Sequence, residues 1–276
     1  MTNILTVDCE DWCHTRISQK YLNKHKNVHC EDRIVSTVTT LLDLLGTHGA
    51  RATFFVLGAV AEKFPALIKR IEKAGHRIGC HGYSHTDIFL KNESEFEREV
   101  DTATTLLNNL VSRPVESFRA PNWSINGKSL WALKILKKYG YKYDSSLTTL
   151  VKSVNRSSED SIIEIPRSTA RIYNFNIPFG GAFLRLYPFT LTISLMRRLN
   201  QRGLPFMVYI HPWEIDAEIP FLRTSPADWI VQYCGISGNL IKIKALLNNF
   251  NFTSIEDFFD RRNLSEKFLN ELYFLA

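Results

Sequence analysis

Short runs of consecutive apolar residues alternate along the chain with longer segments whose apolar residues recur every three or four positions. The first pattern is typical of strands buried on both faces, and the second is typical of helices that cover such strands. The expected strands are ILTVD, RATFFVLG, HRIGCHG, ESFRAP, YKYDSS, SIIEIPRS, PFMVYIHP and FTSIEDFF. The expected helices are IVSTVTTLLDLL, ALIKRIEKA, ESEFEREVDTATTLLNNLV, KSLWALKILKKYG, TLTISLMRRLNQRG and LIKIKALLNNF.

The repeated strand–helix units predict an α/β protein in which helices cover a parallel sheet, either open or closed into a barrel. The rhythm breaks between about residues 145 and 181, where we expect loops or an additional hairpin. No linker rich in proline, glycine or serine divides the 276 residues. We therefore expect residues 1–276 to form a single domain.

Composition and charge argue against several classes of protein. The formal net charge of +6 is mildly basic, but lysine and arginine are scattered and no nucleic-acid-binding motif is found. No window approaches the roughly 20 apolar residues of a membrane-spanning helix, and the first residues lack the basic region of a signal peptide. Five cysteines without CxxC pairs suit a reducing compartment better than a disulfide framework, so the expected location is the cytoplasm.

Seven charged or titratable residues fall at or just after the carboxyl ends of expected strands, namely Asp8, Glu10, Asp11, His81, Arg119, Asp144 and His211. In a parallel α/β fold these strand ends share one face of the sheet, where active sites are built. The three carboxylates of TVDCEDW repel one another unless a positive charge lies between them. We therefore expect a functional site that includes a cation.

The segment CHGYSH places His81 and His85 four residues apart after a strand, so that both imidazoles can converge on one metal ion. Two histidines and one carboxylate form a facial set that leaves positions open for water and substrate. The predicted cofactor is a divalent metal, with Zn²⁺ as the default. A spare carboxylate would act as general base, Arg119 would hold it, and His211 would protonate a leaving nitrogen. These parts suit metal-assisted hydrolysis of an amide or ester.

Six segments resemble, in the same order, the successive motifs of the polysaccharide deacetylases with the NodB homology fold, carbohydrate esterase family 4. They are TVDCEDW, RATFFVLG, RIGCHGYSH, FRAPNWSI, YGYKYDSSL and YIHPWEID. Details such as DCEDW, PFGGAFLRLYP and HPWEID are most similar to the branch found with bacterial exopolysaccharide and PEP-CTERM loci. The resemblance implies a distorted (β/α) barrel, a divalent metal and removal of an acyl group, usually acetyl, from an N-acylated sugar.

The resemblance also implies roles for individual residues. By position, Asp8 matches the catalytic base and Arg119 the arginine that pairs with it. His211 matches the catalytic acid, and Asp144 matches an acidic motif that helps orient that acid.

The metal ligands follow from the same resemblance, with one departure in the first motif. His81 and His85 match the metal histidines. Many relatives have two adjacent aspartates in the first motif, whereas here two residues separate Asp8 from Asp11. On an extended strand Asp8 and Glu10 share a face and Asp11 points away unless the chain turns. We favour Asp11 as the metal carboxylate, because a loop begins there, and keep Glu10 as its rival.

The sequence thus predicts a metal-dependent deacetylase acting on an N-acylated sugar or glycan. The expected substrate is a polysaccharide or its nucleotide- or lipid-linked precursor, and a lipid-linked one implies peripheral contact with a membrane. One alternative is hydrolysis of a non-sugar C–N bond, as in an allantoin-like ring or a formamide. A second alternative is a glycan-binding module without turnover.

Overall fold

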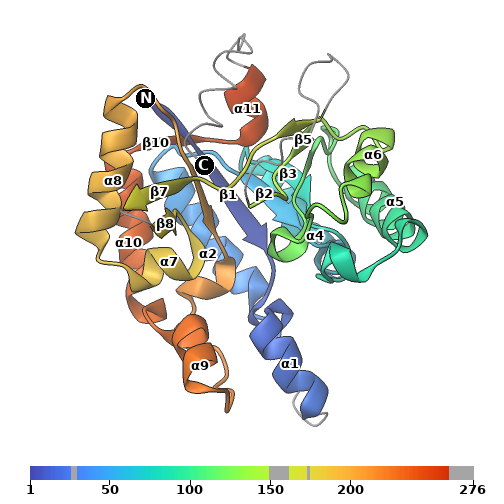
Figure 1. The fold of residues 1–276 in the computed structure, drawn as a ribbon, viewed down its shortest axis with the longest axis horizontal. Helices are drawn as coiled ribbons and strands as arrows, with labels where there is room; N and C mark the ends of the chain where they lie inside the picture. Colours follow the sequence, from blue (N-terminus) through green and yellow to red (C-terminus); the bar gives the residue numbers. More distant parts are fainter. Residues whose placement is uncertain (26–29, 149–161, 173–174, 261–276) are drawn as a thin grey trace.

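The computed structural model describes residues 1–25, 30–148, 162–172 and 175–260 (Figure 1). Eight strands form one parallel sheet in the order β10-β1-β2-β3-β4-β5-β6, with β9 also paired to β1. These strands are β1 (Thr2–Cys9), β2 (Thr53–Val56), β3 (Arg77–Cys80), β4 (Ser117–Phe118), β5 (Tyr143–Asp144), β6 (Ile163–Glu164), β9 (Met207–Ile210) and β10 (Asn251–Thr253). The parallel α/β architecture predicted from the sequence is therefore confirmed.

Helices connect most of the strands along the chain and pack around the sheet. They are α1 (Arg16–Lys24), α2 (Ile34–Thr47), α3 (Gly58–Lys63), α4 (Pro65–Lys73), α5 (Glu93–Leu110), α6 (Trp131–Lys138), α7 (Gly181–Leu186), α8 (Phe189–Gln201), α9 (Pro226–Tyr233), α10 (Ile236–Asn249) and α11 (Ile255–Asp260). Short 3-10 turns are η1 (Trp12–His14), η2 (Ile88–Leu90), η3 (Pro121–Trp123) and η4 (Pro212–Ile215). No helix in the described ranges has the length and apolar character needed to cross a membrane.

Two sequence expectations concern the later part of the chain. The predicted hairpin is present as the antiparallel strands β7 (Thr169–Ile172) and β8 (Phe175–Pro178), although residues 149–161 of the same stretch lie outside the described residues. The predicted strand FTSIEDFF is only partly correct, because β10 gives way to α11. Ser254 explains the change, since its hydroxyl accepts a hydrogen bond from the Asp257 amide and so begins the helix.

The side chains of strand β1 point alternately to the two faces of the sheet. Leu5, Val7 and Cys9 pack into the large core formed with the covering helices. Ile4 points to the opposite face, in a second cluster with residues of β2, β5, β9 and α11. Because successive side chains of a strand point to opposite faces, Asp8 lies on the same face as Ile4. The candidate site therefore begins on the face that the curled sheet turns inward.

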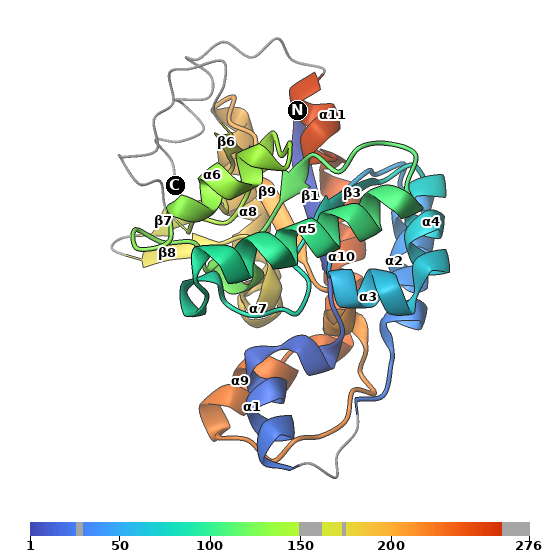
Figure 2. The ribbon, with the colours of Figure 1, turned by 90° about the vertical axis from the view of Figure 1, so that its right-hand side faces the viewer.

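Helices α1 and α9 project together from the end of the molecule toward which β1 runs (Figures 1 and 2). A third apolar cluster packs against residues of α1 and α9, and its buried members are Trp12, Cys13, Trp213, Ile219, Leu222 and Ile236. The two segments that contain α1 and α9 each follow a strand that carries candidate site residues. The turn η1 and helix α1 follow β1, and the turn η4 and helix α9 follow β9. The sequence pattern did not predict α1 or α9.

A disulfide bond joins Cys13 of the third apolar cluster to Cys30, with the two Cα atoms 5.8 Å apart. The expectation that the cysteines form no disulfide framework is corrected for this pair. Their spacing matches no CxxC motif, and only the folding of η1 against the start of α2 brings them together. Cys9, Cys80 and Cys234 are free thiols.

Replacing Cys13 and Cys30 together by serine is expected to lower the free energy of unfolding by about 3 kcal/mol. The bond closes a loop with a sequence separation of 17 residues, and the cost reflects the loss of that constraint on the unfolded chain. Urea unfolding measures the change, with Cys234→Ser as the control that removes a sulfur outside the bond. An equal loss in the control would show that the effect does not come from the cross-link.

Candidate active site

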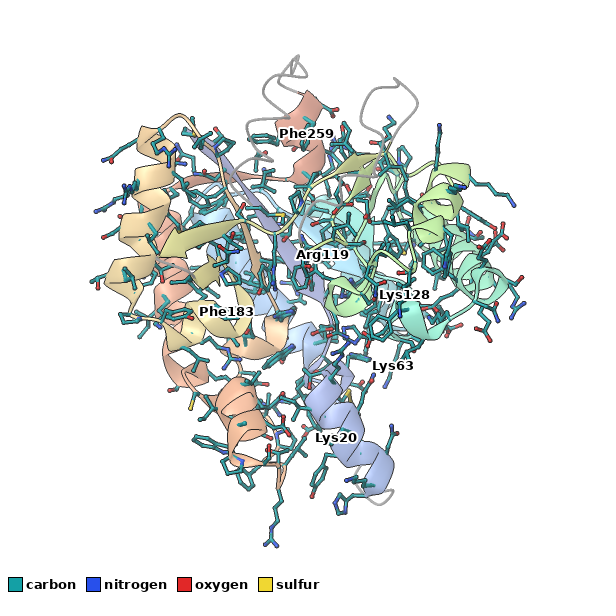
Figure 3. The ribbon with its side chains drawn as sticks, in the orientation of Figure 1. Lys20, Lys63, Arg119, Lys128, Phe183 and Phe259 are labelled. Carbon is teal, nitrogen blue, oxygen red and sulfur yellow. A yellow bond between two sulfur atoms is a disulfide. The ribbon has the colours of Figure 1, made fainter. Side chains whose placement is uncertain are left out.

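A buried ion pair lies on the inward face of the sheet at the ends of β1 and β4. Arg119 Nη1 is 2.6 Å from Asp8 Oδ1, and both side chains are almost fully buried. The same guanidinium donates to the hydroxyls of Thr6 and Ser145 and lies 4.3 Å above the ring of Phe55 (Figure 3 labels Arg119). These contacts hold Arg119 rigidly, so Asp8 is fixed by a partner that has no freedom to move.

Glu10, His81 and His85 form a buried cluster beside this pair. One ligand atom of each residue lies within 4.8 Å of the others. His81 donates from Nδ1 to the backbone carbonyl of Arg119 at 2.7 Å, which leaves its Nε2 free to bind a metal. A carboxylate oxygen of Glu10 lies directly against His85 Nε2. Two imidazoles and one carboxylate are the donor set that a divalent ion prefers, so these residues fit the predicted metal.

The protonation of this cluster also suits a metal. Burial lowers the pKa of His81 to about 4, so its ring is neutral near pH 7 and can act as a ligand. Burial raises the pKa of Glu10, but His85, His211 and His81 outweigh it and bring that pKa well below its ordinary range. Glu10 is therefore a carboxylate surrounded by imidazoles, and its other oxygen accepts a hydrogen bond from the Trp213 indole at 3.2 Å.

Asp11 serves a different purpose in this geometry. Its carboxylate accepts hydrogen bonds from the backbone amides of Trp12 at 2.7 Å, Arg33 at 2.7 Å and Ile34 at 2.9 Å. Both oxygens are thus used to join η1 to the start of α2. The geometry does not support the preference for Asp11 as metal carboxylate and favours its rival Glu10. The reason is the strand alternation, which keeps Glu10 on the face of Asp8.

His211 completes the group from the end of β9. Its Nε2 lies 3.7 Å from Asp8 Oδ2 and 3.9 Å from Glu10 Oε1, so the ring lies beside both carboxylates. Its Nδ1 lies 3.0 Å from Glu214 Oε2, and the same carboxylate accepts the backbone amide of His211. Burial lowers the pKa of His211, but Glu214, Glu10 and Asp8 outweigh it and raise the pKa to about 9. The imidazole is accordingly held as a proton donor.

Glu214 is a site residue that the sequence reasoning missed. It is buried and forms a 2.9 Å ion pair with Arg185 of α7, which is also fully buried. Arg185 in turn donates to the backbone carbonyls of Val231 and Cys234 near the end of α9. The spacing His-x-x-Glu in HPWE was the available signal, because three residues is the reach of a capping side chain in a tight turn.

Asp144 does not contact His211 in the structure. Its carboxyl group accepts from the hydroxyl and amide of Ser146 and shares a hydrogen bond with Glu164. The Ser146 hydroxyl accepts the amide of Ala120, directly after Arg119. Burial raises the pKa of both the Asp144 and the Glu164 carboxyl. Asp144 therefore supports the loop behind Arg119, and the carboxylate that contacts His211 in the structure is that of Glu214.

Two family models match the chain. Residues 28–143 match the model described as polysaccharide deacetylase, and residues 138–260 match a domain of unknown function, DUF3473. The candidate site draws on both regions, because His81, His85 and Arg119 lie in the first and His211 and Glu214 in the second. Strands from both regions also share one sheet, although the single-domain organisation itself stays a prediction.

Curated relatives align with part of the chain. A peptidoglycan-N-acetylglucosamine deacetylase of Bacillus cereus is 41% identical over 93 residues, which are 33% of this chain and 34% of that protein. A peptidoglycan-N-acetylmuramic acid deacetylase of Bacillus subtilis is 29% identical over 37% of this chain and 38% of that protein. The chain thus aligns with little more than a third of the length of these relatives.

Solved structures match nearly the whole fold. A candidate polysaccharide deacetylase from Mycobacterium smegmatis superposes with a TM-score of 0.56 and 17% identity, covering 96% of this chain and 95% of that one. A CE4 family pseudoenzyme from Bacillus anthracis has a TM-score of 0.53 and 12% identity, covering 93% of this chain and 65% of that one. These likenesses confirm the predicted distorted (β/α) barrel. Residues 28–143 of this chain are thus similar to polysaccharide deacetylases in sequence, and the chain as a whole shares their fold.

Proposed function

We propose that this protein is a metal-dependent hydrolase that removes an N-acetyl group from a sugar of a glycan or of its precursor. The observation that carries the proposal is that His211 Nε2 lies 3.7 Å from Asp8 Oδ2 and 3.9 Å from Glu10, which belongs to the cluster formed with His81 and His85. A base, an acid and a metal-ligand set in contact are the parts that amide hydrolysis needs.

Each residue then has a defined task. When bound, a divalent ion held by Glu10, His81 and His85 supplies Lewis-acid polarisation of the acyl carbonyl. Asp8, fixed by Arg119, takes a proton from the water that attacks the carbonyl carbon. His211 gives its proton to the sugar nitrogen as the C–N bond breaks, so the products are acetate and an amine. Zinc is the proposed metal, because a set of two imidazoles and one carboxylate suits it.

The test of this proposal is release of acetate from N-acetylglucosamine oligosaccharides by the purified protein. We expect turnover that a chelator abolishes and added Zn²⁺ restores. Formate or ammonia release from non-sugar amides, without acetate release from sugars, would support the alternative of a non-sugar C–N hydrolase. Glycan binding without any product would support a module without turnover, a possibility that the pseudoenzyme of the same fold makes concrete.

The choice between Glu10 and Asp11 leads to a prediction about metal affinity. Glu10→Gln is expected to weaken Zn²⁺ binding by at least about a hundredfold, since changes even one shell farther out cost 10- to 100-fold. Asp11→Asn is expected to change it by less than about tenfold, because its carboxylate bonds backbone amides. Calorimetric titration of the metal-free protein measures both. The reverse order of the two effects would restore Asp11 as the ligand.

A further inference from the structure

A hollow of about 580 Å³ lies between segments that follow strands β3 and β4 in the chain. One wall comes from η2 and the residue after it, and the other from the loop and first residue of α6. The lining residues are Phe89, Lys91, Asn126, Gly127, Lys128, Ser129 and Trp131. None of these residues takes part in the chemistry proposed above.

Both walls of the hollow directly follow loops that carry candidate site residues. The first wall continues the loop of His81 and His85, and the second continues the loop of Arg119. The strands before these loops, β3 and β4, are adjacent in the sheet. Phe89 follows His85 by four positions. An extended chain of that length spans at most about 14 Å. A short oligosaccharide bridges such a distance.

The two walls are joined to each other, so the hollow has a defined shape. The amide of Ile88 donates to the Ser124 hydroxyl at 2.9 Å. The side-chain amide of Asn122 donates to Asp87 at 2.8 Å. A ligand therefore meets a site whose walls are already connected, and it avoids part of the ordering cost of binding.

Two aromatic rings face the hollow from opposite walls. Phe89 is 46% exposed, so much of its ring is available to a ligand in the hollow. Trp131 is half-buried, and its ring packs edge-on against Phe96 with centroids 5.6 Å apart. Sugar rings present C–H faces that stack on aromatic rings, and aromatic side chains with a few polar groups commonly line ligand sites. The neighbouring Asn126 and Ser129 supply such polar groups.

The charges at the hollow leave one cation unbalanced. Lys91 forms an ion pair with Glu99, whose Oε1 also accepts the amides of Tyr83 and Ser84. Lys128 is exposed and forms no ion pair with any residue that the structure describes. Figure 3 labels Lys128 below and to the right of Arg119. A negatively charged group of a ligand in the hollow could pair with this lysine, which lines it.

We propose that this hollow is a subsite for a second sugar unit of the substrate, and that this unit carries a carboxylate. The aromatic rings stack on the sugar ring, and Lys128 pairs with its carboxylate. The inference rests on the proposed function, because it treats the ligand as part of the glycan whose N-acetyl group is removed. It adds a substrate class, since a neutral N-acetylated polymer offers no anion with which Lys128 could pair.

Binding to the Asp8→Asn variant tests the subsite without turnover. The probes are a tetrasaccharide of alternating N-acetylglucosamine and glucuronic acid, and the neutral N-acetylglucosamine tetramer. At low salt, Lys128→Ala added to this background should weaken binding of the acidic probe about fivefold and leave the neutral probe unchanged. Phe89→Ala should weaken both. The control is Lys134→Ala, an exposed lysine of α6 outside the hollow, which should change neither.

The outcomes separate the subsite from the proposed function. An acidic probe that does not bind, or that binds equally well with Lys128 and with alanine, overturns the subsite. The same holds if Lys128→Ala affects both probes alike or matches Lys134→Ala. Charge-dependent binding in a protein whose Asp8-containing form releases no acetate supports the subsite and contradicts the deacetylase proposal. Acetate release without charge-dependent binding does the reverse.

Discussion

Replacing Asp8 by asparagine is expected to lower kcat for acetate release by about a hundred- to ten-thousand-fold. An amide cannot accept the proton of the attacking water, and general-base catalysis contributes that range. The change also leaves the buried guanidinium of Arg119 without its anionic partner. We therefore expect a loss of about 3–5 kcal/mol in stability, which is the usual cost of breaking a buried ion pair. Acetate release and urea unfolding measure the two effects separately.

The control for Asp8 is Asp144→Asn. This residue is also a buried carboxyl at the end of a strand of the same sheet, β5, but it bonds Ser146 and Glu164 instead of facing His211. It should retain most of the wild-type kcat. If both variants lost kcat equally, the loss would come from disturbed packing of the strand ends. That result would contradict the role of Asp8 as the general base.

Replacing Glu214 by glutamine is expected to lower kcat by about ten- to a hundredfold, as part of the contribution of a positioned general acid. Glu214 is the largest cause that raises the pKa of His211 to about 9, against the effect of burial. Only protonated His211 can donate to the leaving nitrogen. Removing the negative charge lowers that pKa, so the alkaline limb of the kcat profile should move to lower pH. Kinetics between pH 6 and about 10 measure the shift.

The matched control is Glu218→Gln, which removes an exposed carboxylate four residues later on the same segment. It should leave both kcat and the pH profile unchanged. A profile for Glu214→Gln that coincides with wild type would mean that Glu214 serves only the packing around Arg185. In that case the carboxylate that orients His211 would have to be sought elsewhere.

Much of the site could be predicted from the sequence, because it depends on strand ends. Asp8 and Arg119 pair as expected, and His211 faces Asp8 from a strand far along the chain. Parallel strands bring their carboxyl ends together whatever the details of the loops. A short polar segment after an apolar run is therefore sufficient to predict which residues meet, and His81 with His85 follows the same rule.

The contacts of Asp11 and Glu214 and the disulfide were not predicted from the pattern of strands and helices. Asp11 turns away because the amides of Arg33 and Ile34, more than 20 residues later, take up its carboxylate. Glu214 replaces Asp144 beside His211 because the turn after β9 brings it within 3.0 Å. The bond between Cys13 and Cys30 likewise depends on how η1 meets α2. For Asp11 and for the disulfide a segment distant in the sequence determines the contact, whereas Glu214 contacts His211 within one tight turn.

The most direct test of the account is the coordination shell of a Zn²⁺ ion in a crystal of the protein, located by its anomalous scattering. The account predicts one ion bound by Glu10, His81 and His85, with Asp8 and His211 beside it and the Asp11 carboxylate still on its backbone amides. An ion bound through Asp11, or one bound away from the two histidines, would contradict it.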